Sequence, residues 1–134
     1  MARSVDNNGI GALYGTFDIH KTSQTYDLDA DDVGKAVALS GNNEVNLGSD
    51  GGTLLGRLEQ VKDGLATVQV RGVMRLDVNP AENPPAVSQR VIIDGVGRIY
   101  EAPALGGYDP VGGNVSRGTT LAVDGTNNTA DVLL

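Results

Sequence analysis

The clearest pattern in the chain is an alternation of apolar and polar residues between positions 66 and 78. Because successive side chains of a β-strand point to opposite faces, this alternation indicates a strand with one buried and one solvated face. The run of thirteen residues exceeds the usual strand length, so the sequence predicts a sharp bend at Gly72. The positions on the buried parity are Ala66, Val68, Val70, Gly72, Met74, Leu76 and Val78.

Further strands are predicted on both sides of this run. Residues 54–61 form the preceding strand, and Lys62, Asp63 and Gly64 supply the turn of a hairpin. The apolar stretches 36–39 and 91–93 also indicate strands. The chain closes with a hairpin that pairs residues 119–123 with residues 130–134.

Proline and glycine mark two long segments that cannot be central strands. Residues 79–89 contain three prolines, and residues 102–118 contain two Gly-Gly pairs and two prolines. Such segments are typical of surface loops. The sequence therefore predicts a mainly β protein, a small β-barrel or sandwich with long Gly/Pro-rich loops.

The first 24 residues are polar, rich in glycine and only weakly periodic. A segment of this kind buries little of its own surface, so we expect an extended N-terminal arm that becomes ordered on a neighbour. A single β-barrel domain of residues 25–134 would then remain folded after deletion of residues 2–20. The candidate anchors of the arm are its large apolar residues, Ile10, Leu13, Tyr14, Phe17 and Ile19.

A cluster of aspartates follows the arm, at Asp27, Asp29, Asp31 and Asp32. The cluster resembles the opening of an EF-hand loop, but Asp32 stands where that loop needs glycine and Ala38 where it needs glutamate. A short helical turn capped by Asp29 and ended by Gly34 explains the same residues. We therefore expect neither a metal site nor a cofactor.

The composition narrows the range of functions. The 134 residues carry a net charge of -7 with a pI near 4.4, which disfavours nucleic acid and anionic membranes as partners. No apolar run approaches the roughly 18 residues of a membrane span, and we expect synthesis in a cytoplasm. With one Phe and no Trp the core has few rings, so we expect a homo-oligomer, with a trimer favoured.

Catalytic motifs are missing from the sequence. His20 is the only histidine and no Gly-x-Ser-x-Gly elbow accompanies it. One histidine also cannot build the metal cluster of a cupin-like barrel enzyme. These observations favour a protein that binds other molecules without catalysis. The arginines on the polar face of the central hairpin are candidates for an oligomer interface: Arg57, Arg71 and Arg75.

Residues 32–39, 54–58 and 63–73 together resemble the capsid decoration, or cement, proteins of tailed bacteriophages. The likeness extends more weakly through residues 87–99 and 130–134. It implies a small β-barrel, often trimeric, that sits on the outer surface of an icosahedral head and clamps the major capsid protein. The expected location is then the virion. A carbohydrate-binding or adhesive β-module is the alternative, although this chain offers few aromatic platforms.

Overall fold

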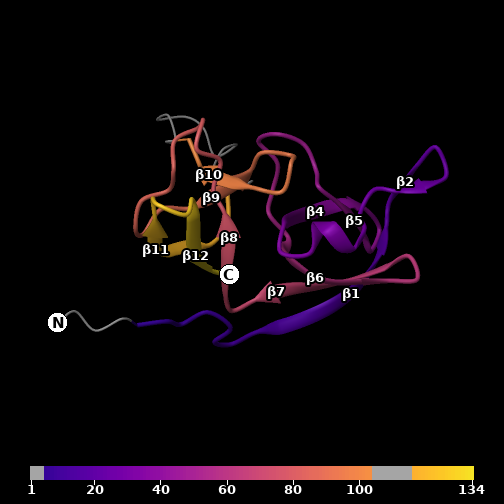
Figure 1. The fold of residues 1–134 in the computed structure, drawn as a ribbon, viewed down its shortest axis with the longest axis horizontal. Coiled ribbons are helices and arrows are strands. Elements are labelled where there is room, and N and C mark those ends of the chain that lie inside the picture. Colours follow the sequence, from indigo (N-terminus) through magenta and orange to yellow (C-terminus); the bar gives the residue numbers. More distant parts are fainter. Residues whose placement is uncertain (1–4, 104–115) are drawn as a thin grey trace.

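The structure, a computed structural model, describes residues 5–103 and 116–134. It is nearly all β, which confirms the predicted fold class, and a closed barrel and a three-stranded sheet are its main parts. Figure 1 shows the barrel strands on the right, the three-stranded sheet on the left, and strand β8 leading from one to the other.

Five strands close the barrel in the order β1-β5-β4-β6-β7. Strand β1 closes it, because it pairs antiparallel with β7 along most of its length and parallel with β5 at Asp18 and Ile19. The barrel strands are β1 (Leu13–Ile19), β4 (Ala36–Gly41), β5 (Glu44–Asn46), β6 (Gly56–Lys62) and β7 (Leu65–Arg71).

The other strands form smaller sheets beside the barrel. The three-stranded sheet has the order β11-β12-β8, and β9 pairs with β10 and β2 with β3. Their bounds are β2 (Lys21–Thr22), β3 (Thr25–Tyr26), β8 (Val73–Asp77), β9 (Val91–Ile93), β10 (Ile99–Glu101), β11 (Thr119–Asp124) and β12 (Thr129–Leu133). The predicted closing hairpin and the 79–89 loop are confirmed, whereas most of the predicted 102–118 loop lies outside the described residues.

Two local predictions hold in detail. Asp63 and Gly64 both have positive φ, 53° and 78°, so the β6–β7 connection is a two-residue turn of the type that suits a twisted hairpin. A single 3-10 turn, η1 (Ala30–Asp32), is capped by Asp29, whose side chain accepts a hydrogen bond from the Asp31 amide.

The apolar core has two parts that share strand β4. Val37 belongs to the cluster inside the barrel, whereas its neighbours Ala36 and Ala38 belong to the cluster under β8, β9 and β12. Because side chains alternate along a strand, β4 serves as a wall between the two clusters. The described chain is thus a barrel with a second β unit packed beside it, where the sequence indicated one barrel.

The predicted boundary of the arm at residue 24 is wrong. Residues 13–19 are strand β1 of the barrel, and Ile19 is only 4% exposed. Gly15 hides the strand pattern, because it takes a position where alternation calls for a larger apolar residue. A Cβ built on Gly15 would lie 2.9 Å from the Phe17 ring, which lies beside that position. Deleting residues 2–20 would therefore remove a barrel strand.

The bend predicted at Gly72 is confirmed, and it separates β7 from β8. Gly72 has φ of 91°, a conformation that other residues adopt only with strain. A Cβ on this residue would lie 2.6 Å from the carbonyl carbon of Gly11 and 2.7 Å from the Ala12 nitrogen. Both neighbours are backbone atoms, so the N-terminal segment would have to move to accept any side chain.

We predict that Gly72→Ala lowers the free energy of unfolding by about 2 to 4 kcal/mol, because backbone strain and a backbone clash act together. Urea unfolding measures the change. Gly51→Ala is the matched control, since Gly51 has φ of 85° but no atom within 4 Å of the place that a Cβ would take. We expect a loss near 1 kcal/mol for the control. Equal losses in the two variants would contradict the close backbone approach.

Candidate functional site

The structure divides the five apolar candidates of the N-terminal segment into two groups. Ile10, Leu13 and Tyr14 expose 60%, 54% and 54% of their surface. Ile19 is buried in the barrel cluster, and Phe17 packs against that cluster from its edge. Ile19 is therefore part of the core, which corrects its assignment as a contact residue, whereas Phe17 is partly buried beside it.

Val5 adds a further exposed apolar side chain to this segment, with 74% of its surface accessible. Val5, Ile10, Leu13 and Tyr14 are called here the N-terminal apolar set. Sequence reasoning omitted Val5 because an isolated valine in a polar stretch carries no periodic signal. Large apolar side chains exposed close together in one segment are candidates for contacts with another protein.

Part of the backbone that carries these residues is fastened to strand β8, whereas Leu13 and Tyr14 lie on β1, which pairs with β7. The Gly9 amide donates to the Val73 carbonyl at 2.7 Å, and the Val73 amide donates to the Ile10 carbonyl at 2.9 Å. The Arg75 guanidinium, held by Asp131, also lies 3.4 Å from an Asp6 carboxylate oxygen. The N-terminal apolar set thus projects from a held backbone, and in Figure 1 this segment runs along the molecule into β1.

The three candidate interface arginines have different surroundings. Arg57 pairs with Glu59 at 2.7 Å and donates to the Arg75 carbonyl. Arg75 pairs with Asp131 at 2.8 Å. Arg71, at the exposed end of β7, has no recorded ion pair or side-chain hydrogen bond with any described residue. Of the three arginines, Arg71 is thus the one whose guanidinium has no partner among the described residues.

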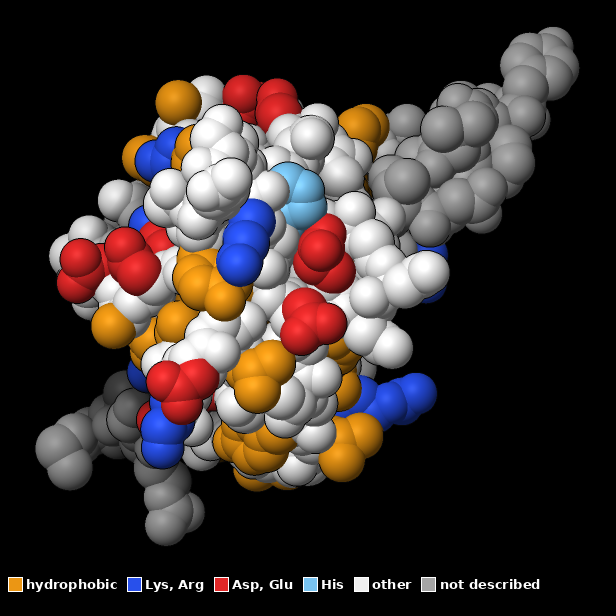
Figure 2. Space-filling model, turned by 90° about the vertical axis from the view of Figure 1, so that its right-hand side faces the viewer, with side chains coloured by type: hydrophobic (Ala, Val, Ile, Leu, Met, Phe, Trp, Pro, Cys, Tyr) orange, Lys and Arg blue, Asp and Glu red, His pale blue; other side chains and the backbone are white. Residues whose placement is uncertain are grey.

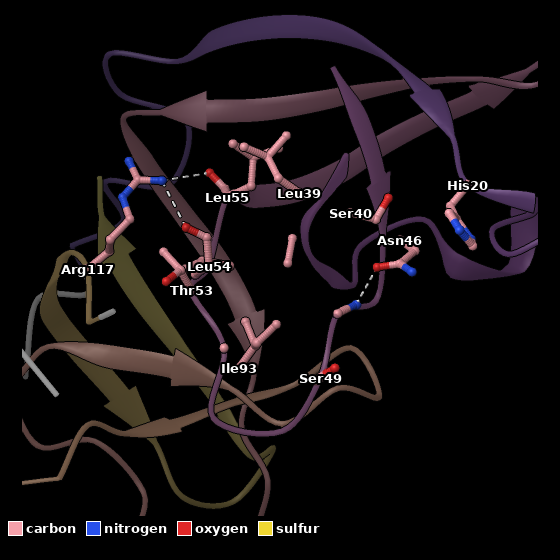
Figure 3. Close-up of a pocket in the computed structure, with 13 residues that line it drawn as sticks. His20, Leu39, Ser40, Asn46, Ser49, Thr53, Leu54, Leu55, Ile93 and Arg117 are labelled. Carbon is pink, nitrogen blue, oxygen red and sulfur yellow. Dashed lines mark hydrogen bonds between the residues drawn. The ribbon is translucent and has the colours of Figure 1, made fainter. Parts of the chain in front are cut away.

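An open pocket of about 580 Å³ lies between the barrel and the second β unit. Figure 3 shows Arg117 at one end of this pocket and His20 at the other, with Leu39 and Ile93 between them. The Arg117 guanidinium donates through Nη1 to the carbonyl oxygens of Leu54 at 2.8 Å and Leu55 at 3.2 Å. Arg117 lies near the end of the predicted 102–118 loop, where no sequence pattern singled it out.

His20 is held by a carboxylate on the surface shown in Figure 2. Its Nδ1 lies 2.8 Å from Oδ2 of Asp27, and the Thr22 hydroxyl donates to Oδ1 of Asp27 at 2.7 Å. The Asn46 amide donates to the same carboxylate at 3.3 Å. The Thr22 hydrogen bond is the largest cause that lowers the pKa of Asp27, and the His20 and Asn46 bonds add to it.

The other clustered aspartates also serve the fold. The Asp32 carboxylate accepts from the Asp29 amide and pairs with Lys35 at 2.6 Å, so it closes the capping box of η1. Across residues 5–103 and 116–134, no group of three or more His, Cys, Asp and Glu side chains is arranged to hold a metal ion. The described residues likewise include no helix long and apolar enough to cross a membrane.

The tyrosines among the described residues differ in how open their rings are to a binding partner. The Lys21 ammonium sits 4.7 Å from the centre of the Tyr26 ring, so that ring face is covered. The Tyr100 hydroxyl donates to Asp50 at 2.8 Å, and burial together with this carboxylate raises the pKa of Tyr100 to about 12. Tyr14 has neither kind of recorded contact with the described residues and remains open to a partner.

No protein-family model matches the chain, and a search of curated proteins finds no match. The surface features described above are therefore the basis on which a function can be assigned.

We predict that Asp6→Ala loosens the N-terminal segment without unfolding the barrel. An exposed ion pair contributes about 0.2 to 1 kcal/mol, so the Gly9 amide should exchange hydrogen about 1.4- to fivefold faster. Asp77→Ala, which removes an exposed carboxylate on β8, is the matched control and should leave Gly9 unchanged. Unchanged exchange at Gly9 in Asp6→Ala would show that the Arg75 contact does not hold the segment.

We predict that Asp27 makes stability depend on pH in the acid range. Its pKa is lowered by folding, so its contribution is present above the unfolded value near 3.9 and is lost as the pH falls through the folded value. Below about pH 4, the melting temperature should therefore fall less steeply with decreasing pH in Asp27→Asn than in the wild type. Asp18→Asn, at an exposed carboxylate without a recorded side-chain bond, should keep the wild-type slope, and equal slopes in all three proteins would refute the prediction.

Proposed function

We propose that this chain is a non-enzymatic structural protein of a tailed-phage virion. It binds the outer surface of the icosahedral head and stabilises the shell of the major capsid protein. The observation that supports this proposal best is the N-terminal apolar set, four exposed side chains on a segment that bonds to β8 at Gly9 and Ile10 and to β7 along β1. The resemblance of the barrel sequence to capsid decoration proteins supports it independently.

The energetics of such a surface suit attachment to another protein. Burying apolar surface contributes about 25 cal/mol for each Å² removed from water, so a few large side chains suffice for a substantial part of binding. A free arm would lose about 1 to 2 kcal/mol of conformational entropy for each residue ordered on docking. Hydrogen bonds from Gly9 and Val73 fix part of this segment before docking, so less entropy remains to be lost.

An oligomer on the shell is part of the proposal. Of the large fully buried side chains among the described residues, none is aromatic. Such a core contributes less burial than one with Phe or Trp, and contacts between copies would add to it. We favour a trimer. Of the three arginines predicted at the interface, Arg71 is the best candidate for a contact between copies, because its charge has no partner among the described residues of its own chain.

The carbohydrate-binding alternative has less support. Sugar recognition commonly uses an open aromatic face, and Lys21 covers one face of Tyr26 whereas the Tyr100 hydroxyl is tied to Asp50. Tyr14 is open, but its exposed neighbour Leu13 is aliphatic. This setting suits an apolar protein contact better than a polar glycan.

The test is binding of purified protein to undecorated, expanded capsids of the phage that encodes it. We expect the double variant Leu13→Ser, Tyr14→Ser to need at least about tenfold more protein for half occupancy, the effect of losing about 1.4 kcal/mol. Both side chains are more than half exposed, so the fold should survive, and a thermal unfolding curve checks this.

Val87→Ser is the matched control, because Val87 is 61% exposed and lies in the loop after β8. Its occupancy curve should coincide with that of the wild type. Equal curves for all three proteins would remove the N-terminal apolar set from the mechanism. Failure of the wild type to bind any capsid would overturn the proposed function itself.

A further inference from the structure

Asn8 and Gly9 form the only Asn-Gly step in the sequence. An asparagine side chain loses its amide without an enzyme when the backbone nitrogen of the following residue attacks its amide carbon. Glycine in the second position favours this reaction, because it has no Cβ to shield the nitrogen or to restrict the backbone. The chain thus contains one position where spontaneous deamidation is favoured by its neighbour.

The side chain of Asn8 is open to such an attack. Asn8 and Gly9 are both exposed, and the Asn8 side-chain amide has no recorded hydrogen bond with any described residue. A Cβ built on Gly9 would have no heavy atom within 4 Å, so the space beside this residue is empty as well. Within the part of the chain that the structure describes, neither a hydrogen bond nor a packed neighbour shields the Asn8 amide.

The attacking nitrogen, in contrast, is held. The Ile10 amide donates to the Asn7 carbonyl at 3.0 Å, so Asn8 and Gly9 take the central positions of a turn, where Gly9 has φ of 89°. The Gly9 amide donates to the Val73 carbonyl at 2.7 Å. To react, this nitrogen must give up its proton and turn toward Cγ of Asn8, and the bond to Val73 opposes both steps. Deamidation therefore requires that the turn first leaves β8.

Asp6 provides a second, weaker hold on the same turn. One of its carboxylate oxygens, Oδ1, accepts from the Asn8 amide at 2.9 Å and lies 3.4 Å from the Arg75 guanidinium of β8. Exposed ion pairs contribute little to stability, and exposed segments open far more often than the whole protein unfolds. The released form of the segment is thus accessible from the folded protein.

We propose that Asn8 is a site of spontaneous deamidation and that release of the N-terminal segment from β8 sets its rate. The Gly9 nitrogen forms a bond to Cγ of Asn8, and the bond from Cγ to the side-chain nitrogen breaks. The proton lost from Gly9 leaves with that nitrogen as ammonia, and a cyclic succinimide remains. Water then opens the ring at either of its carbonyls, which yields aspartate or isoaspartate.

The products would make the release permanent. Either product places a second carboxylate close to Asp6, within the segment that carries the N-terminal apolar set. In isoaspartate the backbone runs through the former side chain and is longer by one carbon, so the bonds of Gly9 and Ile10 to Val73 no longer fit one turn. This inference goes beyond the proposed function, and only an effect of the modification on capsid attachment would rest on that function.

The test follows the full-length protein in mildly alkaline buffer and measures deamidation over time by peptide mass spectrometry. A synthetic peptide of residues 5–12 with blocked ends gives the rate of the released segment. We expect Asn8 to react at least about fivefold more slowly in the protein, the ratio for an opening free energy of about 1 kcal/mol. Asn43, which is exposed and followed by Glu44, is the internal control and should keep its amide.

Deamidation at Asn8 no faster than at Asn43 would overturn the site. Equal rates at Asn8 in the protein and in the peptide would overturn its control by the contact with β8.

Asp6→Ala should raise the rate at Asn8 about 1.4- to fivefold, relative to a peptide with the same change, because it weakens the hold on the turn. Asp77→Ala is the matched control and should leave the rate unchanged. An unchanged rate in Asp6→Ala would contradict a rate set by release of the segment.

The modified protein carries one more negative charge and separates by ion exchange. Its Val73 amide, which donates to Ile10 in the unmodified protein, should exchange hydrogen faster, and unchanged exchange would refute the permanent release. None of these measurements involves a capsid, so their failure is distinct from failure of the proposed function.

Discussion

The close backbone contact at Gly72 is the constraint on which the rest of this structure depends. The amide and carbonyl of Gly72 both bond to Leu134, and the next amide, of Val73, bonds to Ile10. Three distant parts of the chain therefore meet at one residue that has no side chain. The bend directs β7 into the barrel and β8 into the three-stranded sheet, and the same contact holds the N-terminal segment in place. The position of the N-terminal apolar set thus follows from a packing requirement of the fold.

Features encoded by neighbouring residues could be predicted from the sequence. The alternation from Ala66 to Val78 predicted one strand with a sharp bend at Gly72, which the structure divides into β7 and β8, because a period of two is a direct consequence of strand geometry. Asp63 and Gly64 identified their turn, since both need positive φ. Asp29 identified the cap of η1 for a similar local reason. Candidates such as Leu13 and Tyr14 followed from their apolar character within a polar stretch.

Features that depend on distant contacts were not predictable in the same way. Strand β1 escaped notice because Gly15 interrupts its apolar face, and its partners β5 and β7 lie far along the chain. The burial of Ile19 follows only from the pairing of β1 with these two strands. Arg117 became notable once the fold placed it against the carbonyls of Leu54 and Leu55. Each case joins residues whose spacing in sequence carries no signal.

The central claim is that a held N-terminal segment, and not a free arm, contacts the capsid. Hydrogen exchange compared between the free and the capsid-bound protein tests it most directly. A docking role for this segment predicts that, in the free protein, the amides of residues 9–14 already exchange hydrogen more slowly than they would in an unfolded chain. On the capsid their exchange should slow further. Strand β11 and its hairpin should keep their rates. Unprotected amides at residues 9–14 in the free protein, or new protection confined to β11 and β12, would contradict the claim.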